Sequence, residues 1–281
     1  MGSIQVVTDS GCDLMPATAD EHDVTVVPLT IRFGDEEFVD REELSTKEFW
    51  DRVVTGPHTP ETAAPSPGAF QQAYLRAAEA GRSGVLCLTI SSRLSATYQA
   101  AVTAAASVQD RIPVRVVDTL SVTLGQGVLA LAAAEMAARG DDLDTMERAL
   151  LDKVPRTHVY GVIGSLDYLK RGGRIGGAAH LVGSLLSIKP VIEVRDGVVE
   201  VESKQRTRAR AMQYLAERAT SAGRLEWLGL ADGVAPDIAE VVSVVQGATC
   251  DHELVLADLG PVVGAHAGPQ SVGLCFVTAP R

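Results

Sequence analysis

Residues 84–98 read GVLCLTISSRLSATY, and this stretch decides the fold class. The apolar run at 84–89 is typical of a buried strand, and the Ala-rich run that follows the serine-rich turn predicts a helix to Val108. A strand, a polar turn and a helix N-terminus in this order form the repeating unit of a parallel α/β sheet.

Two more units of the same kind occur in the first half of the chain. Residues 4–8 predict a strand that runs into Thr8-Asp9-Ser10, and residues 114–118 predict a strand followed by Asp118-Thr119-Leu120-Ser121. The carboxyl ends of parallel strands meet at one edge of a sheet, where open α/β sheets bind ligands. We therefore expect a parallel sheet with a hydroxyl-rich edge.

The second half of the chain predicts mixed strand pairing. Asp196-Gly197 lies between two strand-like runs and is a strong hairpin signal. A helix that ends at Pro155 marks the expected junction between an N-terminal domain, residues 1–155, and a C-terminal domain, residues 156–281. The predicted fold is α/β in both, with a parallel sheet in the first domain, a mixed sheet in the second and a pocket between them.

Composition excludes several classes of partner. The net charge of the 281 residues is −11 and no run of cations occurs, which disfavours nucleic acid and anionic membranes. Residues 122–134 form the most apolar predicted helix, which is shorter than the roughly 20 residues of a membrane span. The first residues lack the pattern of a signal peptide, and the four cysteines form no C-x-x-C pair. We expect a cytoplasmic protein with buried free thiols, no stable membrane insertion, no metal and no cofactor.

Residues 165–196, SLDYLKRGGRIGGAAHLVGSLLSIKPVIEVRD, combine glycines, cations and an apolar segment. The glycines at 172–177 have P-loop spacing, but Ala178-Ala179 stands where Lys and Ser or Thr would be needed to bind phosphate. A helix is predicted at 178–186 with apolar residues on more than one face. It is either a doubly buried core helix or the wall of an apolar tunnel, and in the second case Leu181, Leu185 and Leu186 line the pocket.

The motifs of common enzymes are missing. No G-x-S-x-G and no H-x-x-x-H occurs, and Gly125-Gln126-Gly127 begins too far from its strand for a dinucleotide turn. What remains is a supply of small hydroxyls, one histidine in a glycine–proline loop expected at 260–269, and arginines beside glycines. Hydroxyls satisfy carboxylate oxygens and a nearby cation offsets their desolvation, so a polar head with an apolar tail indicates a fatty acid.

Several motifs, in order along essentially the whole chain, resemble the DegV family of bacterial fatty-acid-binding proteins. The matching stretches are Thr8-Asp9-Ser10, Pro60-x-Thr62-x-x-Pro65-Ser66-Pro67, Ser91-Ser92-x-Leu94-Ser95-x-Thr97-Tyr98, Asp118-Thr119-Leu120-Ser121, Tyr168-Leu169-Lys170-Arg171-Gly172-Gly173-Arg174-Ile175, Ile188-Lys189-Pro190 and Gly260-Pro261-Val262-Val263-Gly264-x-His266-x-Gly268-Pro269.

The resemblance implies a long-chain fatty acid enclosed between two α/β domains. Its carboxylate would be held by Thr62 and by a serine of the Ser92/Ser95 turn, with His266 near the head group. In the family the bound acid is presented to a fatty acid kinase, which phosphorylates the carboxylate. Arg174 and Arg206 match cations near the pocket mouth that suit the kinase or the acyl phosphate. The protein would then be a carrier and not itself an enzyme.

The sequence lacks the hydroxyls that the family usually has at three positions. Ala63, Ala265 and Ala267 replace residues that are usually polar, so we expect fewer head-group donors. Two alternatives stay open beside the carrier. One is an enzyme or binding protein for a small hydroxylated or phosphorylated substrate, with His266 as nucleophile or base. The other is a structural or regulatory protein whose pocket is filled. One of Ser92 and Ser95 is also expected to be a helix cap.

Overall fold

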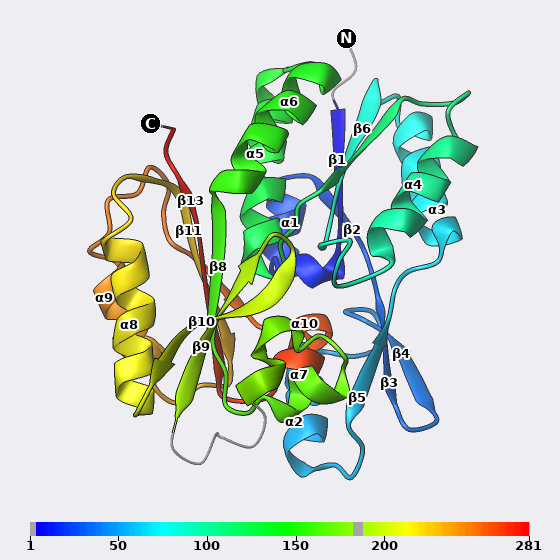
Figure 1. The fold of residues 1–281 in the computed structure, drawn as a ribbon. Coiled ribbons are helices and arrows are strands. Elements are labelled where there is room, and N and C mark those ends of the chain that lie inside the picture. The colour runs from blue at the N-terminus through cyan, green and yellow to red at the C-terminus, as the bar shows by residue number, and fades with distance from the viewer. Residues whose placement is uncertain (1–3, 182–187, 281) are drawn as a thin grey trace.

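The computed structural model describes residues 4–181 and 188–280, and its sheets divide between the two halves of the chain (Figure 1). A four-stranded and a three-stranded sheet come from the first half, and a six-stranded sheet begins at Thr157. The predicted class, α/β with a parallel N-terminal sheet and a mixed C-terminal sheet, is confirmed. The change of sheet falls next to the expected junction at residue 155, but the division into two domains stays a prediction.

The first sheet is parallel throughout, with the strand order β2-β1-β6-β7. Alternate residues of its buried strands face opposite layers: Val7 and Cys87 pack on one side, and Val6 and Leu86 on the other. Helices α3 and α4 cover the first side, and α5 and α6 cover the second. The elements are β1 (Ile4–Asp9), β2 (Val24–Val27), β6 (Gly84–Thr89), β7 (Val114–Asp118), α1 (Pro16–Glu21), α3 (Pro67–Glu79), α4 (Thr97–Ser107), α5 (Leu124–Arg139) and α6 (Leu143–Lys153).

The three-stranded sheet corrects three expectations that the sequence raises for residues 24–68, namely one strand at 24–33, a solvated acidic turn at 35–43 and a proline-rich linker at 56–68. The strand predicted at 24–33 is broken after Val27, since Pro28 has no N–H for a ladder, and the chain leaves the first sheet there. The acidic stretch expected as a solvated turn contains β4, and the proline-rich loop contains β5 at the edge of the sheet, where proline is tolerated. The strands of this antiparallel sheet lie in the order β4 (Glu36–Val39), β3 (Thr30–Phe33) and β5 (Pro60–Ala63). Helix α2 (Thr46–Thr55) lies in the chain between β4 and β5.

The C-terminal sheet has the order β10-β9-β8-β13-β11-β12 and mixes parallel with antiparallel pairs. The predicted hairpin at Asp196-Gly197 is confirmed, with positive φ at both residues. Helices α8 and α9 cover one face, and α5 packs against β11 and β13 on the other (Figure 1). The elements are β8 (Thr157–Val162), α7 (Asp167–Arg171), β9 (Lys189–Arg195), β10 (Val198–Gln205), α8 (Arg208–Thr220), β11 (Leu225–Gly233), α9 (Ile238–Val245), β12 (Val255–Asp258), α10 (Pro261–Ala267) and β13 (Ser271–Thr278).

The helix predicted at 178–186 differs from the structure where the structure describes it. Gly176–Leu181 form a 3₁₀ helix, in which Ala178 N–H donates to Ile175 O at 3.0 Å. Gly176 has a φ of +47° and lies against the backbone of Val199, so this segment packs tightly on β10. Leu181 ends the 3₁₀ helix, whereas Leu185 and Leu186 lie outside the described residues. Across 4–181 and 188–280, no helix combines the length and hydrophobicity needed to cross a membrane.

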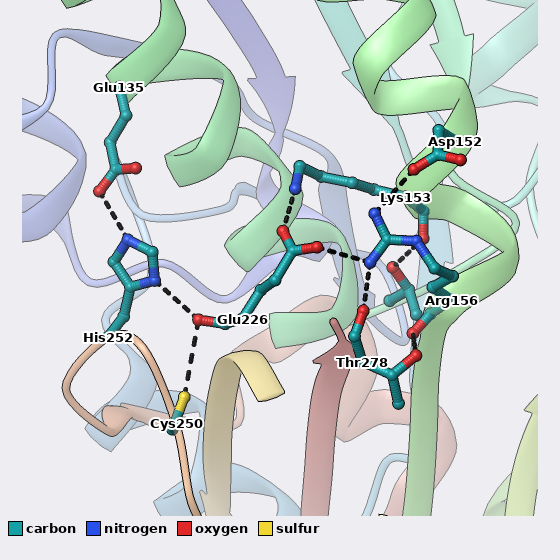
Figure 2. Close-up of polar contacts among 9 residues, drawn as sticks. Glu135, Asp152, Lys153, Arg156, Glu226, Cys250, His252 and Thr278 are labelled. Carbon is teal, nitrogen blue, oxygen red and sulfur yellow. Dashed lines mark hydrogen bonds and ion pairs between the residues drawn. The ribbon is translucent and has the colours of Figure 1, made fainter. Parts of the chain in front are cut away.

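Polar contacts join α5 and α6 to the C-terminal sheet (Figure 2). The carboxylate of Glu226 on β11 accepts hydrogen bonds from Lys153 and from Arg156, whose Nη1 lies 2.6 Å away. The carbonyl of Glu226 lies 2.7 Å from His252 Nδ1, and His252 Nε2 lies 3.1 Å from Glu135 on α5. Glu226 therefore connects the two halves of the chain, both through its side chain and through its backbone carbonyl.

Replacing Glu226 with Gln should destabilise the protein by about 1–3 kcal/mol, because two largely buried cations lose their charged acceptor. Burial would raise the pKa of Glu226, but the hydrogen bonds and charges of Lys153 and Arg156 hold it below the ordinary value of 4.5. The stabilisation is therefore present above pH 4.5 and is lost as the pH falls further. Urea unfolding of Glu226→Gln and of the parent should converge in acid, with exposed Glu240→Gln as the control. A constant difference down to pH 3 would contradict this.

Candidate functional site

An apolar cavity lies between the first half of the chain and the C-terminal sheet. The cavity and its opening to solvent together contain about 850 Å³ of space free of protein atoms. Its aliphatic wall comes from both halves and includes Leu29, Ile90, Leu94, Val122, Val159, Ile163, Leu169, Ile192, Val194, Val199, Leu259, Val262 and Val263. The polar residues among its lining are Thr62, Ser95, Thr123, Tyr160, Arg174, His266 and Ser271.

His266 lies on a short helix and not on the glycine–proline loop that the sequence predicted. Helix α10 begins with Pro261 at its first position, where a proline costs no hydrogen bond, and it buries Val262 and Ala265. Gly264 lies against α2, since a Cβ there would be 2.7 Å from Phe49. The helix is thus fixed by packing, and His266 in its last turn is held in a defined position.

The imidazole of His266 pairs with Thr62 of β5. His266 Nε2 lies 2.9 Å from Thr62 Oγ1, although 204 positions separate the two residues. The other nitrogen, Nδ1, is buried and has no hydrogen-bond partner within the described chain. Burial, and next the charge of Arg174, lower the pKa of His266 to about 4. At neutral pH the ring therefore carries one N–H and one lone pair.

Arg174 joins the glycine segment to the turn after β6. Its Nε donates to Leu94 O at 3.0 Å and its Nη1 to Gly172 O at 2.6 Å. Gly172 cannot carry a side chain, because a Cβ would overlap the ring of His266. Arg174, Gly172 and His266 therefore form one contact group, and Arg174 is among the residues that line the cavity.

The two candidate serines have different surroundings. Ser95 lines the cavity, with its Oγ 2.8 Å from Thr97 Oγ1 at the start of α4. Ser92 is exposed, is not one of the residues that line the cavity, and its backbone N–H donates to Asp118 Oδ1 at 3.1 Å. Arg206 is likewise exposed, before α8, and does not line the cavity. The structure brings together Thr62, Ser95, Arg174 and His266, and it leaves Ser92 and Arg206 outside.

The first polar turn is used for structure and does not line the cavity as the sequence suggested. Thr8 Oγ1 donates to Leu88 O at 2.9 Å, and Ser10 Oγ accepts from Leu29 N–H at 3.0 Å. Asp9 accepts from the N–H groups of Gly11 and Ile90. Burial raises the pKa of Asp9 to about 6 in spite of these bonds. All three side chains therefore satisfy backbone groups at the strand ends.

The residues that the sequence did not indicate are chiefly those of the C-terminal sheet. Val159, Ile192 and Val194 line the cavity from β8 and β9. Alternation along β9 separates an apolar face, which carries Ile192 and Val194, from a face that carries Glu193, but it does not say whether the apolar face meets a cavity or a packed core. Of the positions where family hydroxyls are replaced, Ala267 lines the cavity, whereas Ala265 is buried elsewhere and Ala63 is exposed.

Comparison with known proteins identifies the family. A model of the DegV family, described as uncharacterised proteins, matches residues 3–279. The chain belongs to the DegV family. A DegV domain-containing protein of Streptomyces coelicolor is 36% identical over 278 residues, which cover 96% of this chain and 97% of that protein.

Solved DegV structures have the same fold. A DegV family protein from Thermus thermophilus, described by its fatty acid binding, has a TM-score of 0.88 and 31% identity, covering 99% of this chain and 100% of that one. DegV of Bacillus subtilis, described as a fatty acid binding protein, has a TM-score of 0.85 and 26% identity, covering 99% and 100%.

His266 should stay neutral well below the pH at which an exposed histidine takes up a proton. An NMR titration should place its transition near pH 4. Because the unfolded chain takes up this proton first, stability should fall as the pH drops from about 6.5 to 4, by at most about 3 kcal/mol. His266→Gln should lose less stability over that interval. A transition near pH 6.5 would show that the site is hydrated and not buried.

Proposed function

We propose that this protein binds a long-chain fatty acid, with the carboxylate at Thr62, Ser95, Arg174 and His266 and the acyl tail along the aliphatic wall. The observation that carries the proposal is the contiguous polar group at an otherwise apolar cavity. Thr62 contacts His266, His266 contacts Gly172, and Arg174 binds both Gly172 O and Leu94 O next to Ser95. The charged head of a fatty acid matches this polar group, and its apolar tail matches the aliphatic wall.

The neutral imidazole suits a carboxylate ligand. When Nε2–H donates to Thr62 Oγ1, the hydroxyl proton of Thr62 is free and the lone pair of Nδ1 lies against Gly172. Thr62 is then able to donate this proton to a carboxylate oxygen. Arg174 supplies the positive charge that offsets the desolvation of the anion. The tail contributes about 0.8 kcal/mol for each buried methylene, part of which is offset by the cost of binding.

The apolar wall disfavours the rival reading, a small hydroxylated or phosphorylated substrate. The hydroxyls of such a molecule would face aliphatic side chains and lose their hydrogen bonds to water. A catalytic histidine also needs a third group that orients its ring, and Nδ1 of His266 contacts no such group among the described residues. The relatives from Thermus thermophilus and Bacillus subtilis, described as binding fatty acids, further support the carrier.

We also propose that the bound acid is presented to a fatty acid kinase, so that this chain is a carrier and not the enzyme. Arg206 supports this part, because it is exposed and free of the cavity wall. Its cation is available to an acidic partner or to an acyl phosphate without any role in holding the acid. Arg174 contributes to binding, since it lines the cavity.

Mass spectrometry tests the function directly. Protein purified under native conditions and then denatured should release a long-chain fatty acid in a one-to-one ratio, and lipid-stripped protein should take up added acid with saturable affinity. A protein that is empty and takes up no acid would overturn the proposal. Turnover of a small phosphorylated or hydroxylated substrate would favour the enzyme instead.

Ser95→Ala and Ser92→Ala form a matched pair within one turn. Ser95→Ala should raise the dissociation constant for the fatty acid about 10-fold or more, because a hydrogen bond to a charged group is worth about 1.5–3 kcal/mol. Ser92→Ala should leave it unchanged, since Ser92 is exposed. Displacement of a fluorescent fatty acid measures both. Equal effects of the two substitutions would remove Ser95 from the head-group site.

Arg206→Glu should leave fatty acid affinity within about twofold of the parent and slow acyl-phosphate formation by an added fatty acid kinase. The reason is that a reversed charge at an exposed position changes association with a charged partner and not the buried site. Raising the salt concentration should reduce the difference between parent and variant. Unchanged phosphorylation rates, or a parallel loss of binding, would contradict the assignment of Arg206 to the partner surface.

A further inference from the structure

Two glycines lie opposite each other at the centre of the six-stranded sheet. Gly161 of β8 pairs with Gly273 of β13, the two middle strands in the order β10-β9-β8-β13-β11-β12. Both glycines are only partly buried, although the residues before and after each of them are buried. A glycine inside a strand weakens the sheet and often marks a place where a ligand approaches the backbone. Both glycines line the cavity.

The glycine pair forms a local trough across the sheet. In the same row, Ile192 is opposite Gly161 on β9, and Ala231 is opposite Gly273 on β11. In the next row on this face, α5 covers β11, since a Cβ at Gly229 would lie 3.1 Å from Leu124, whereas Val159 and Val194 line the cavity from β8 and β9. Among the described residues that line the cavity, the two without a side chain are Gly161 and Gly273.

The trough has room for an added methyl group. A Cβ at Gly273 would be 3.5 Å from Ala231 Cβ and 3.9 Å from Thr123 Cγ2, which are ordinary van der Waals distances. A Cβ at Gly161 would be 3.2 Å from Ile192 Cγ1, which is tighter and requires a small shift of that side chain. A methyl group therefore fits at Gly273 without displacing its neighbours, and it fits at Gly161 with a small shift of Ile192.

We propose that Gly161 and Gly273 determine acyl-chain specificity and that they accommodate a methyl branch on the fatty acid. This inference rests on the proposed binding of fatty acids. A straight chain would leave the trough partly empty and lose dispersion contacts with its lining. A branch placed over the pair fills the space. Gly273 lies two residues, about 7 Å along the strand, from Ser271, which donates to Ala267 O beside His266, so the branch falls within the chain and not at the head group.

The proposal is tested by moving a methyl branch along the fatty acid and by measuring its effect on affinity in the parent and in glycine variants. Dissociation constants are measured for octadecanoic acid and for a series of its derivatives, each with one methyl group at a different carbon. In the parent, one stretch of carbons should accept the branch with an affinity equal to or above that of the straight acid. In Gly273→Ala, the wall methyl occupies the same space, and affinity for those derivatives should fall about fivefold or more. The straight acid should change less than about twofold.

Two further variants are measured beside Gly273→Ala. Gly161→Ala should repeat its selective effect from the opposite strand. Gly68→Ala on α3 is the matched control, because it adds the same methyl at an exposed position where the nearest atom, Ser66 Oγ, is 3.6 Å away. Thermal unfolding establishes that each variant is folded, and failure of Gly273→Ala to fold would contradict the free space on which the inference rests.

The outcomes separate this inference from the proposed function. A parent that binds the straight acid but loses affinity for every branched derivative overturns the inference alone. An equal loss of straight and branched acids in Gly273→Ala does the same. A parent that binds none of the acids overturns the proposed function and this inference with it.

Discussion

Burial of α5 on all sides is the constraint on which the rest of the structure depends. Its first eleven residues, from Leu124 on, are all buried. A helix that is apolar all round must be covered all round, so the parallel sheet packs on one side and β11 and β13 on the other. The helix, about 10 Å wide, then acts as a spacer between the sheets. Val122 and Thr123, just before α5, line the cavity, so the space opens where the spacer ends.

The local features of the fold could be predicted from the sequence, and the contacts between distant segments could not. The strand–turn–helix units and the Asp196-Gly197 hairpin depend on neighbours in the chain, and both were predicted correctly. Pairing of β3 with β5 joins residues about thirty positions apart, and prolines near β5 concealed it. Helix α10 was concealed in the same way, because its glycines and prolines read as a loop although packing on α2 stabilises it.

The candidate site shows the same limit. The sequence indicated hydroxyls at Thr8, Ser10, Ser92 and Ser95 without distinguishing them. The hydroxyls of Thr8 and Ser10 form hydrogen bonds with backbone groups. The turn after β6 exposes Ser92, whereas Ser95 lines the cavity. Which hydroxyl serves structure and which serves a ligand depends on tertiary contacts. The pair Thr62–His266 and the position of Arg174 beside it are likewise tertiary, and the family resemblance indicated them where spacing alone did not.

The charge state of His266 decides what the proposed head-group site is able to hold. A protonated imidazole beside Arg174 would place two cations in a largely buried site, and a single carboxylate would neutralise one of them. Burial and the charge of Arg174 keep the ring neutral, so one guanidinium faces one carboxylate and the remaining contacts are neutral donors. Ala267 lines the cavity and supplies no such side-chain donor. The hydroxyl of Thr62 therefore carries a larger share of the hydrogen bonding, and the neutral ring of His266 orients that hydroxyl without adding a second charge.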